Sequence, residues 1–227
     1  MLDKIEKSII LISGGMDSAV CAGLAALKTN QLYGLHINYG QKTQEKELQS
    51  FNLICEHYNF TDKLIVDIEY LTKIGGSSLT DSSIEISKGN INSEEIPSSY
   101  VPFRNANILA IAVSWAEVIK ANKIYIGAME EDSSGYPDCR EDFFKSFQQT
   151  LSLGTKPNTE IRIETPIIHN TKKDIIGIGL KIGVPFEKTW SCYKSNLAAC
   201  GECDSCLIRL RGWEESGNID PIKYENN

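Results

Sequence analysis

The sequence contains no run of about 18 or more apolar residues, so we expect no transmembrane helix. Its first residues lead directly into an apolar strand pattern, and we expect no signal peptide. It also lacks a strongly basic stripe, and 30 acidic against 23 basic residues give a formal net charge of −7. An acidic chain of this kind is a poor candidate for binding a large nucleic acid. We therefore expect a cytoplasmic protein that acts on a small molecule, with no nucleic acid and no membrane as partner.

The seven cysteines do not suit a disulfide framework, because their number is odd and no leader is expected. Four of them, Cys192, Cys200, Cys203 and Cys206, follow the spacing C-x7-C-x2-C-x2-C. Four thiolates at this spacing suit a closed, tetrahedral structural Zn2+ site. An iron–sulfur cluster is the competing metal, since cysteines at x2 intervals also occur in ferredoxin-like runs. Four unligated thiols are the remaining alternative. We predict zinc, with the metal fastening the C-terminal segment.

Apolar strand-like runs alternate with helical patterns along the chain. This alternation predicts an α/β fold, a Rossmann-like parallel sheet with helices on both faces. The expected strands are 8–12, 32–39, 63–68 and 123–128, and the expected helices are 19–27, 45–58, 105–120 and 142–153. Residues 75–97 are rich in Ser, Gly, Asn and Glu and predict a long loop, either a lid or a disordered insert. We expect a catalytic domain over 1–187 and a four-cysteine segment over 188–227.

The segment from Ser13 to Ser18, Ser-Gly-Gly-Met-Asp-Ser, is the most informative motif. It joins the first predicted strand to the first predicted helix. Glycines let the backbone come close to a ligand, and the free N–H groups at a helix start favour an anion. An ordinary strand-to-helix turn capped by Asp17 or Ser18 is the alternative. We predict that this loop holds phosphate oxygens.

The loop lacks the lysine of the G-x-x-x-x-G-K-[ST] motif, so it is not the usual P-loop. It resembles the S-G-G-x-D-S signature of the ATP pyrophosphatases. Those enzymes cut ATP between the α and β phosphates and place AMP on a substrate oxygen. The resemblance therefore implies the adenine nucleotide α-hydrolase-like form of the fold, with ATP and Mg2+ as cofactors.

Further blocks make the resemblance more specific. They are Tyr39-Gly40-Gln41, Gly75 to Asp81, Tyr100 to Asn105, Ser134-Gly135-Tyr136-Pro137-Asp138-Cys139-Arg140, Thr189 to Tyr193 and Cys200 to Cys206. Together with the phosphate loop, these blocks are similar to the 7-cyano-7-deazaguanine synthase family over nearly the whole chain. Two positions depart from the family: Phe103 stands where a small residue is frequent, and Lys42-Thr43 stands where Arg-His is frequent. We expect Phe103 to reshape the pocket, and the missing histidine to remove a polar contact.

The resemblance implies conversion of 7-carboxy-7-deazaguanine and ammonia into the 7-cyano compound through adenylated intermediates, in queuosine biosynthesis. It also implies a carbon–nitrogen ligase and suggests a homodimer. The residues that it predicts for the nucleotide are Ile12, Ser13, Gly14, Gly15, Met16, Asp17, Ser18, Ala19, His36 and Tyr39. Those that it predicts for the substrate are Arg104, Asn105, Glu130, Tyr136, Asp138 and Arg140, and the catalytic candidates are Asp17, Ser18, Arg104 and Arg140.

Three other functions compete with this interpretation. A tRNA-thiolating ATP pyrophosphatase shares the loop, but it needs a tRNA-binding surface. A relative that attaches a deazapurine to a protein would carry the same motifs. A zinc-ribbon binding module without catalysis would have no use for the phosphate loop. No glutaminase segment is visible, so we expect free ammonium as the nitrogen source.

Overall fold

A computed structural model describes residues 6–81, 83–86, 96–130 and 135–225. Its strands are β1 (Lys7–Leu11), β2 (Gln31–Asn38), β3 (Asp62–Asp67), β4 (Lys123–Ile126) and β5 (Arg162–Glu164). Its α-helices are α1 (Met16–Ala26), α2 (Gln44–His57), α3 (Tyr70–Ile74), α4 (Arg104–Ile119), α5 (Glu141–Gly154), α6 (Lys172–Ile182) and α7 (Asp204–Glu215). Two 3-10 helices, η1 (Pro137–Cys139) and η2 (Phe186–Lys188), complete the described elements.

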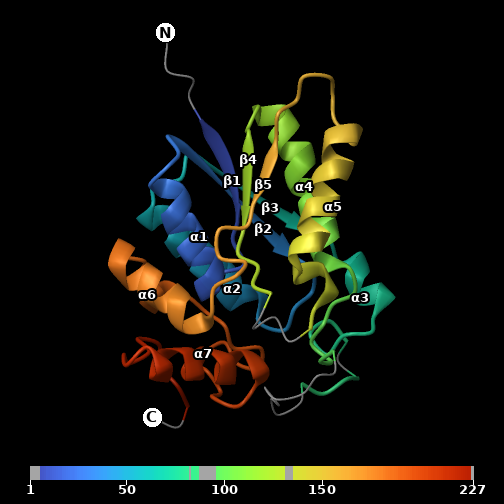
Figure 1. The fold of residues 1–227 in the computed structure, drawn as a ribbon. Helices are drawn as coiled ribbons and strands as arrows, with labels where there is room; N and C mark the ends of the chain where they lie inside the picture. The colour runs from blue at the N-terminus through green and yellow to red at the C-terminus, as the bar shows by residue number, and fades with distance from the viewer. Residues whose placement is uncertain (1–5, 82, 87–95, 131–134, 226–227) are drawn as a thin grey trace.

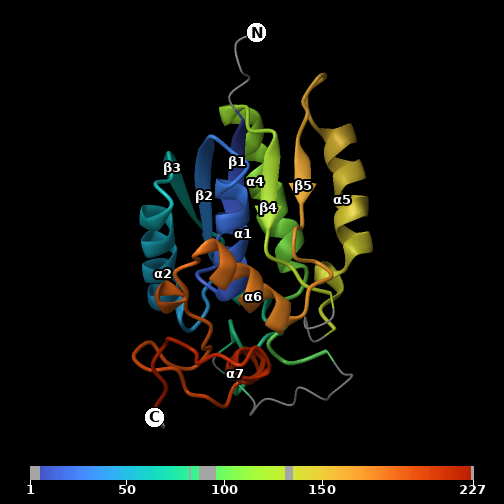
Figure 2. The same ribbon diagram turned by 60° about the vertical axis from the view of Figure 1, so that its left-hand side comes forward.

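The strands form one sheet in the order β3-β2-β1-β4-β5, and every neighbouring pair is parallel. Figures 1 and 2 show helices on both faces of this sheet. The predicted α/β fold is confirmed, and the predicted strands and helices differ from the observed ones only at their ends. Elements β5, α6 and α7 lie in a part of the chain to which the sequence analysis assigned no strand or helix.

Alternating side chains of β1 and of Ile12, the residue that follows it, divide the core into two layers, because successive residues of a strand point to opposite faces. Ile9 and Leu11 pack with buried residues of α4 and α5. Ile10 and Ile12 pack with buried residues of α1, α2 and α6. The central strand is thus buried on both sides, as expected for a parallel sheet. Burial on both faces holds the end of β1, and the loop that follows it, in a fixed place.

The last segment of the chain lies across the carboxyl ends of the strands, with α7 beneath the sheet in Figure 1. Helix α7 packs against α6. The described parts of the predicted loop, residues 75–81, 83–86 and 96–97, also lie at this end of the molecule. Residues 82 and 87–95 are outside the described part, so the expected lid stays a prediction. Among the described residues, no helix is both long enough and apolar enough to cross a bilayer.

His36 in β2 gives the fold a predicted pH dependence. Its Nδ1 lies 2.8 Å from the Ile12 carbonyl oxygen, and its ring lies 5.1 Å from that of Phe51. Burial lowers the pKa of His36, while the contact with the Ile12 carbonyl acts in the opposite direction. The unfolded chain therefore takes up this proton first as the pH falls. The contribution of His36 to the free energy of unfolding is fully present above the unfolded pKa of about 6.5 and decreases as the pH falls below it.

We expect the free energy of unfolding to fall between pH 7 and about pH 5.5 by more in the wild type than in His36→Asn. The asparagine retains a hydrogen-bond donor but does not titrate. Denaturant unfolding at the two pH values measures the difference. The matched control is His57→Asn on the exposed face of α2, in which the free energy of unfolding should change with pH as in the wild type. An equal change in all three proteins would show that His36 does not carry the effect.

Candidate functional site

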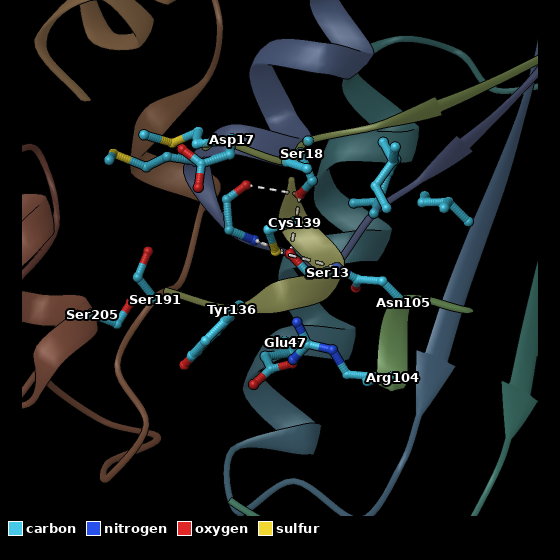
Figure 3. A pocket seen from close by; sticks show the side chains of 18 of the residues that line it. Ser13, Asp17, Ser18, Glu47, Arg104, Asn105, Tyr136, Cys139, Ser191 and Ser205 are labelled. Carbon is cyan, nitrogen blue, oxygen red and sulfur yellow. Dashed lines mark hydrogen bonds between the residues drawn. The ribbon is translucent and has the colours of Figure 1, made fainter. Parts of the chain in front are cut away.

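A cavity of about 270 Å³ opens at the carboxyl ends of the strands. The chain runs outward from β1 through β2 to β3, and it then returns to β4 on the other side of β1. Ligands of open α/β sheets bind at this kind of switch point, between the ends of neighbouring strands. Residues following β1 and β4 line the cavity, together with residues from α2, α4 and the C-terminal segment. Figure 3 shows the polar side chains that surround it.

The loop between β1 and α1 has the local structure of an anion site. Helix α1 begins at Met16, and its N-cap Gly15 has no side chain to cap the first turn. The Ser13 hydroxyl accepts a hydrogen bond from the Gly15 amide at 3.3 Å, and the Ser18 hydroxyl donates to the Gly15 carbonyl at 2.9 Å. These bonds fix the shape of the loop. The first-turn amides can then bind an anion, which the helix dipole favours.

A lysine from a distant helix reaches this loop. Lys172, the first residue of α6, places its Nζ 2.8 and 3.0 Å from the two carboxylate oxygens of Asp17. The Lys172 side chain is 10% exposed, that of Asp17 is 30% exposed, and both residues line the cavity. The Lys172 Nζ also lies 3.2 Å from the Met129 sulfur. The loop therefore has a fixed cation beside it, although it lacks the lysine of a P-loop.

Two glycines let other elements come close to the loop. Gly14 has a φ of +90°, and a Cβ there would lie 2.7 Å from the Glu47 carbonyl oxygen of α2. A Cβ on Gly127, just after β4, would lie 2.8 Å from the Asp17 carbonyl carbon. Side chains at either position would push the loop away from its neighbours. The loop is thus held between α2 and the end of β4.

Arg104 faces the cavity from the start of α4. Its Nη1 donates a hydrogen bond to the Tyr39 hydroxyl at 3.2 Å, and its guanidinium lies 5.4 Å from the centre of the Tyr39 ring. Within the described part of the chain, its buried Nε has no hydrogen-bond partner. Burial raises the pKa of Tyr39 to about 12, so the phenol stays neutral beside the guanidinium. Arg104 thus retains donor capacity for an anionic or carbonyl-bearing ligand.

The turn around η1 fixes the start of α4. Buried Asp138 accepts a hydrogen bond from the Asn105 backbone amide at 2.8 Å, and the Asn105 side chain donates to the Asp138 carbonyl at 2.9 Å. The Asn105 side chain also approaches the Cys139 sulfur at 3.3 Å. Burial raises the pKa of Cys139 to about 11, so this thiol is protonated at neutral pH and poorly suited to be a nucleophile. This network holds Arg104, the neighbour of Asn105, at the cavity wall.

Most of the residues predicted from the sequence come together at this cavity. Those that line it are Ile12, Ser13, Gly15, Met16, Asp17, Ser18, Tyr39, Arg104, Asn105 and Tyr136. Those that do not line it are Gly14, Ala19, His36, Glu130, Asp138 and Arg140. The Glu130 Oε2 lies 3.9 Å from the His169 Nδ1, and Arg140 is the exposed N-cap of α5. The direct ligand contacts of all these residues stay predictions.

Several cavity residues were not predicted from the sequence as ligand contacts. They include Glu47, Cys139, Lys172, Trp190, Ser191, Tyr193, Asp204, Ser205 and Arg209. One local signal was available for Lys172, because Thr171 and Asp174 form the capping box that begins α6. Phe103 lies outside the cavity and 60% exposed, with its ring against that of Phe143. The expected reshaping of the pocket by Phe103 therefore has no direct contact to support it.

The four cysteines of the C-terminal segment converge at one point. Their sulfur atoms all lie within 4.8 Å of one another, and all four residues are buried. The Cys200 and Cys206 sulfurs are 3.9 Å apart. Tetrahedral zinc with bonds of about 2.3 Å requires about 3.8 Å between sulfurs, so the residues fit a Zn2+ ion. The Lys194 and Cys200 amides also donate to the Cys192 sulfur, at 3.3 and 3.4 Å, as suits a thiolate ligand.

The cysteine segment is connected directly to the loop between β1 and α1. The Trp190 amide, two residues before Cys192, donates to the Gly14 carbonyl at 2.8 Å. Arg209 of α7 is buried and binds both carboxylate oxygens of Asp220, at 2.6 and 2.8 Å. It also donates to the Thr189 hydroxyl at 2.8 Å. These contacts link α7 to Thr189, and the next residue, Trp190, contacts Gly14.

The family model and the similar sequences agree on one family. The family model described as "Queuosine biosynthesis protein QueC" matches residues 7–217. The 7-cyano-7-deazaguanine synthase of Chloroherpeton thalassium is 53% identical over 219 residues, which cover 96% of this chain and 97% of that protein. The protein of the same name from Chlorobium phaeobacteroides (strain BS1) is 54% identical over the same shares of both chains. Among solved structures, NMN synthetase from Francisella tularensis matches with a TM-score of 0.49 and 14% identity, over 96% of this chain and 79% of that one. The long family match and the high identities show that this chain belongs to the queuosine biosynthesis protein QueC family.

Proposed function

We propose that this protein is a 7-cyano-7-deazaguanine synthase, which converts 7-carboxy-7-deazaguanine, ammonia and ATP into the nitrile. One observation supports the proposal beyond the family match: a loop with the geometry of an anion site and Arg104, whose buried Nε has no partner among the described residues, line the same cavity. The loop suits the phosphates of ATP, and the arginine suits a carboxylate. A site that activates a carboxylate with ATP needs both.

The chemistry needs two activations, because oxide is a poor leaving group. In the first, a carboxylate oxygen attacks the α-phosphorus of ATP and pyrophosphate leaves. Ammonia then attacks the acyl carbon, AMP leaves with the carboxylate oxygen, and an amide forms. In the second, the amide oxygen attacks the α-phosphorus of another ATP and pyrophosphate leaves. Loss of AMP, which carries the amide oxygen, and of both protons of the amide nitrogen then leaves the nitrile. Each nitrile therefore costs two ATP and releases two AMP and two pyrophosphates.

The proposed roles of the residues follow from their positions. The first-turn amides of α1, with Ser13 and Ser18, bind the phosphates. Lys172 lies beside the same loop and offsets the charge that builds up on the leaving pyrophosphate. Arg104 donates to the substrate carboxylate, and Tyr136, which also lines the cavity, stacks on the base.

Two metals belong to the proposal. Mg2+ prefers oxygen ligands, and the Asp17 carboxylate at the cavity offers them. When bound, Mg2+ shields the phosphates. Zn2+ held by the four cysteines is structural, because its four protein ligands close the coordination sphere. The cytoplasmic location, the homodimer and the use of free ammonium are parts of the same proposal.

One product analysis tests the function. The purified protein is incubated with ATP, Mg2+, ammonium and 7-carboxy-7-deazaguanine, and the products are identified by mass spectrometry. We expect the nitrile together with two AMP per nitrile, and no nitrile when ammonium is omitted. Accumulation of the amide without nitrile would favour the relative that attaches a deazapurine to a protein. Absence of any turnover would contradict the proposal.

A further inference from the structure

Glu47 is a cavity carboxylate to which the mechanism above gives no role. It lies in the first half of α2 and lines the cavity beside the phosphate loop. Burial raises its pKa, whereas hydrogen bonds from Thr43 and Gln41 act in the opposite direction. Burying a carboxylate in a cavity wall costs free energy, and ionisable groups of this kind cluster at functional sites.

The two oxygens of Glu47 are held in place but not saturated. The Thr43 hydroxyl donates to Oε1 at 2.8 Å, and the Gln41 Nε2 donates to Oε2 at 3.0 Å. Gln41 is itself fixed, because its Oε1 accepts from the Tyr39 amide at 2.9 Å. A carboxylate can accept about four hydrogen bonds, so acceptor capacity remains on both oxygens. The carboxylate is thus pre-oriented for two further donors.

Arg104 is close to Glu47 without being bound to it. Figure 3 shows the two side chains next to each other on one wall of the cavity. The charge of Arg104 acts on the Glu47 carboxyl, yet no ion pair joins the two among the residues that the structure describes. The guanidinium instead binds Tyr39 through Nη1 and leaves Nε without a partner in the same part of the chain. The wall therefore offers a fixed acceptor next to a fixed donor.

The substrate of the proposed reaction has the complementary edge. Going around 7-carboxy-7-deazaguanine, the 7-carboxylate and the neighbouring ring carbonyl are acceptors. The ring N–H and the 2-amino group that follow are donors. An arginine beside a carboxylate matches this order of two acceptors and two donors.

We propose that Glu47 is the specificity-determining residue that accepts hydrogen bonds from the ring N–H and the 2-amino group, while Arg104 donates to the adjacent carbonyl and carboxylate. This inference rests on the proposed function and names how the same cavity selects its substrate. It also gives a role to Thr43, one of the three residues that depart from the family pattern, because Thr43 anchors the Glu47 carboxylate.

Other acidic residues are less suited to this task. Asp138 lies outside the cavity and accepts from the Asn105 amide, and Asp17 is bound by Lys172. Glu130 lies outside the cavity with its side chain 43% exposed. Asp204 lines the cavity at the start of α7 and is the alternative that an experiment must separate from Glu47.

The test compares two substrates in steady-state kinetics with Glu47→Gln. One is 7-carboxy-7-deazaguanine, and the other is its analogue without the 2-amino group. We expect the wild type to prefer the first by about 100-fold in kcat/KM, since a hydrogen bond to a charged group is lost with the analogue. In Glu47→Gln this preference should fall below about 5-fold, because kcat/KM for 7-carboxy-7-deazaguanine decreases. The KM for ATP should be unchanged.

Three further variants make the result specific. Glu45→Gln, on the same helix but exposed, should behave as the wild type. Thr43→Val retains the Glu47 carboxylate but removes the hydrogen bond from the Thr43 hydroxyl, so this variant should lose part of the substrate preference. It keeps the inference testable if Glu47→Gln folds poorly. Asp204→Asn should keep the preference.

A preference retained in Glu47→Gln, or lost in Asp204→Asn instead, would overturn the inference. So would a raised KM for ATP in Glu47→Gln with the substrate preference unchanged. Wild-type protein that makes no nitrile would instead overturn the proposed function. The two failures are therefore distinct.

Discussion

Lys172→Met is expected to lower kcat/KM for ATP by about 10²- to 10³-fold, the range measured when one preorganised donor to transition-state charge is removed. In the folded protein the Lys172 Nζ lies within 3.0 Å of both Asp17 oxygens. Without it, the Asp17 carboxylate beside the proposed phosphate site loses its ion-pair partner. Pyrophosphate release measured against ATP concentration shows the effect.

The matched control is Lys173→Met, because Lys173 is the next residue of α6 and is exposed. This control should retain wild-type kinetics, which would exclude a general effect of net charge. Lys172→Met with unchanged kcat/KM would show that the lysine only fastens α6 to α1. A lowered melting temperature together with normal kinetics would lead to the same conclusion.

Cys203→Ser is expected to release the metal and to weaken ATP binding as well as stability. Cys203 is fully buried in the cluster, and the Trp190 amide joins the same segment to the carbonyl of Gly14. Loss of a structural metal removes several kcal/mol, which corresponds to about 10 °C or more in Tm for a domain of this size. Because the segment also braces the phosphate loop, the Kd for ATP should rise about 10-fold. Metal content, thermal unfolding and ATP binding measure the three effects.

Cys55→Ala serves as the control for this experiment. Cys55 is buried on α2, away from the cluster, so its loss should cost some stability but leave metal content and ATP affinity as in the wild type. If Cys203→Ser lost its metal but bound ATP normally, the segment would not brace the loop. Retention of the metal by the variant would contradict the four-ligand site.

The fold and the phosphate loop could be predicted because their signals are local. Gly14 and Gly15 lie between a short apolar strand and a helix, and alternating patterns mark each unit of the sheet. The cysteines likewise carry their spacing in the sequence. Residues such as Arg104 were found through motif blocks of the family, and the structure places that arginine at the cavity wall.

The remaining residues of the site depend on long-range packing. Lys172 reaches Asp17 across 155 positions of sequence, which no local pattern reveals. Glu47 looks like a solvated acid of an amphipathic helix, and only the close contact of α2 with Gly14 brings it to the cavity. Asp138 shows the opposite case, because its motif indicated a ligand contact and the structure gives it a bond to the start of α4.

The path of oxygen in the reaction tests the central claim most directly. We would supply 7-carboxy-7-deazaguanine with both carboxylate oxygens labelled with 18O and analyse the AMP by mass spectrometry. If the cavity places AMP on the substrate oxygen twice, each AMP will carry one 18O and two labelled AMP will form per nitrile. Unlabelled AMP would mean that water attacks ATP, and it would contradict the account.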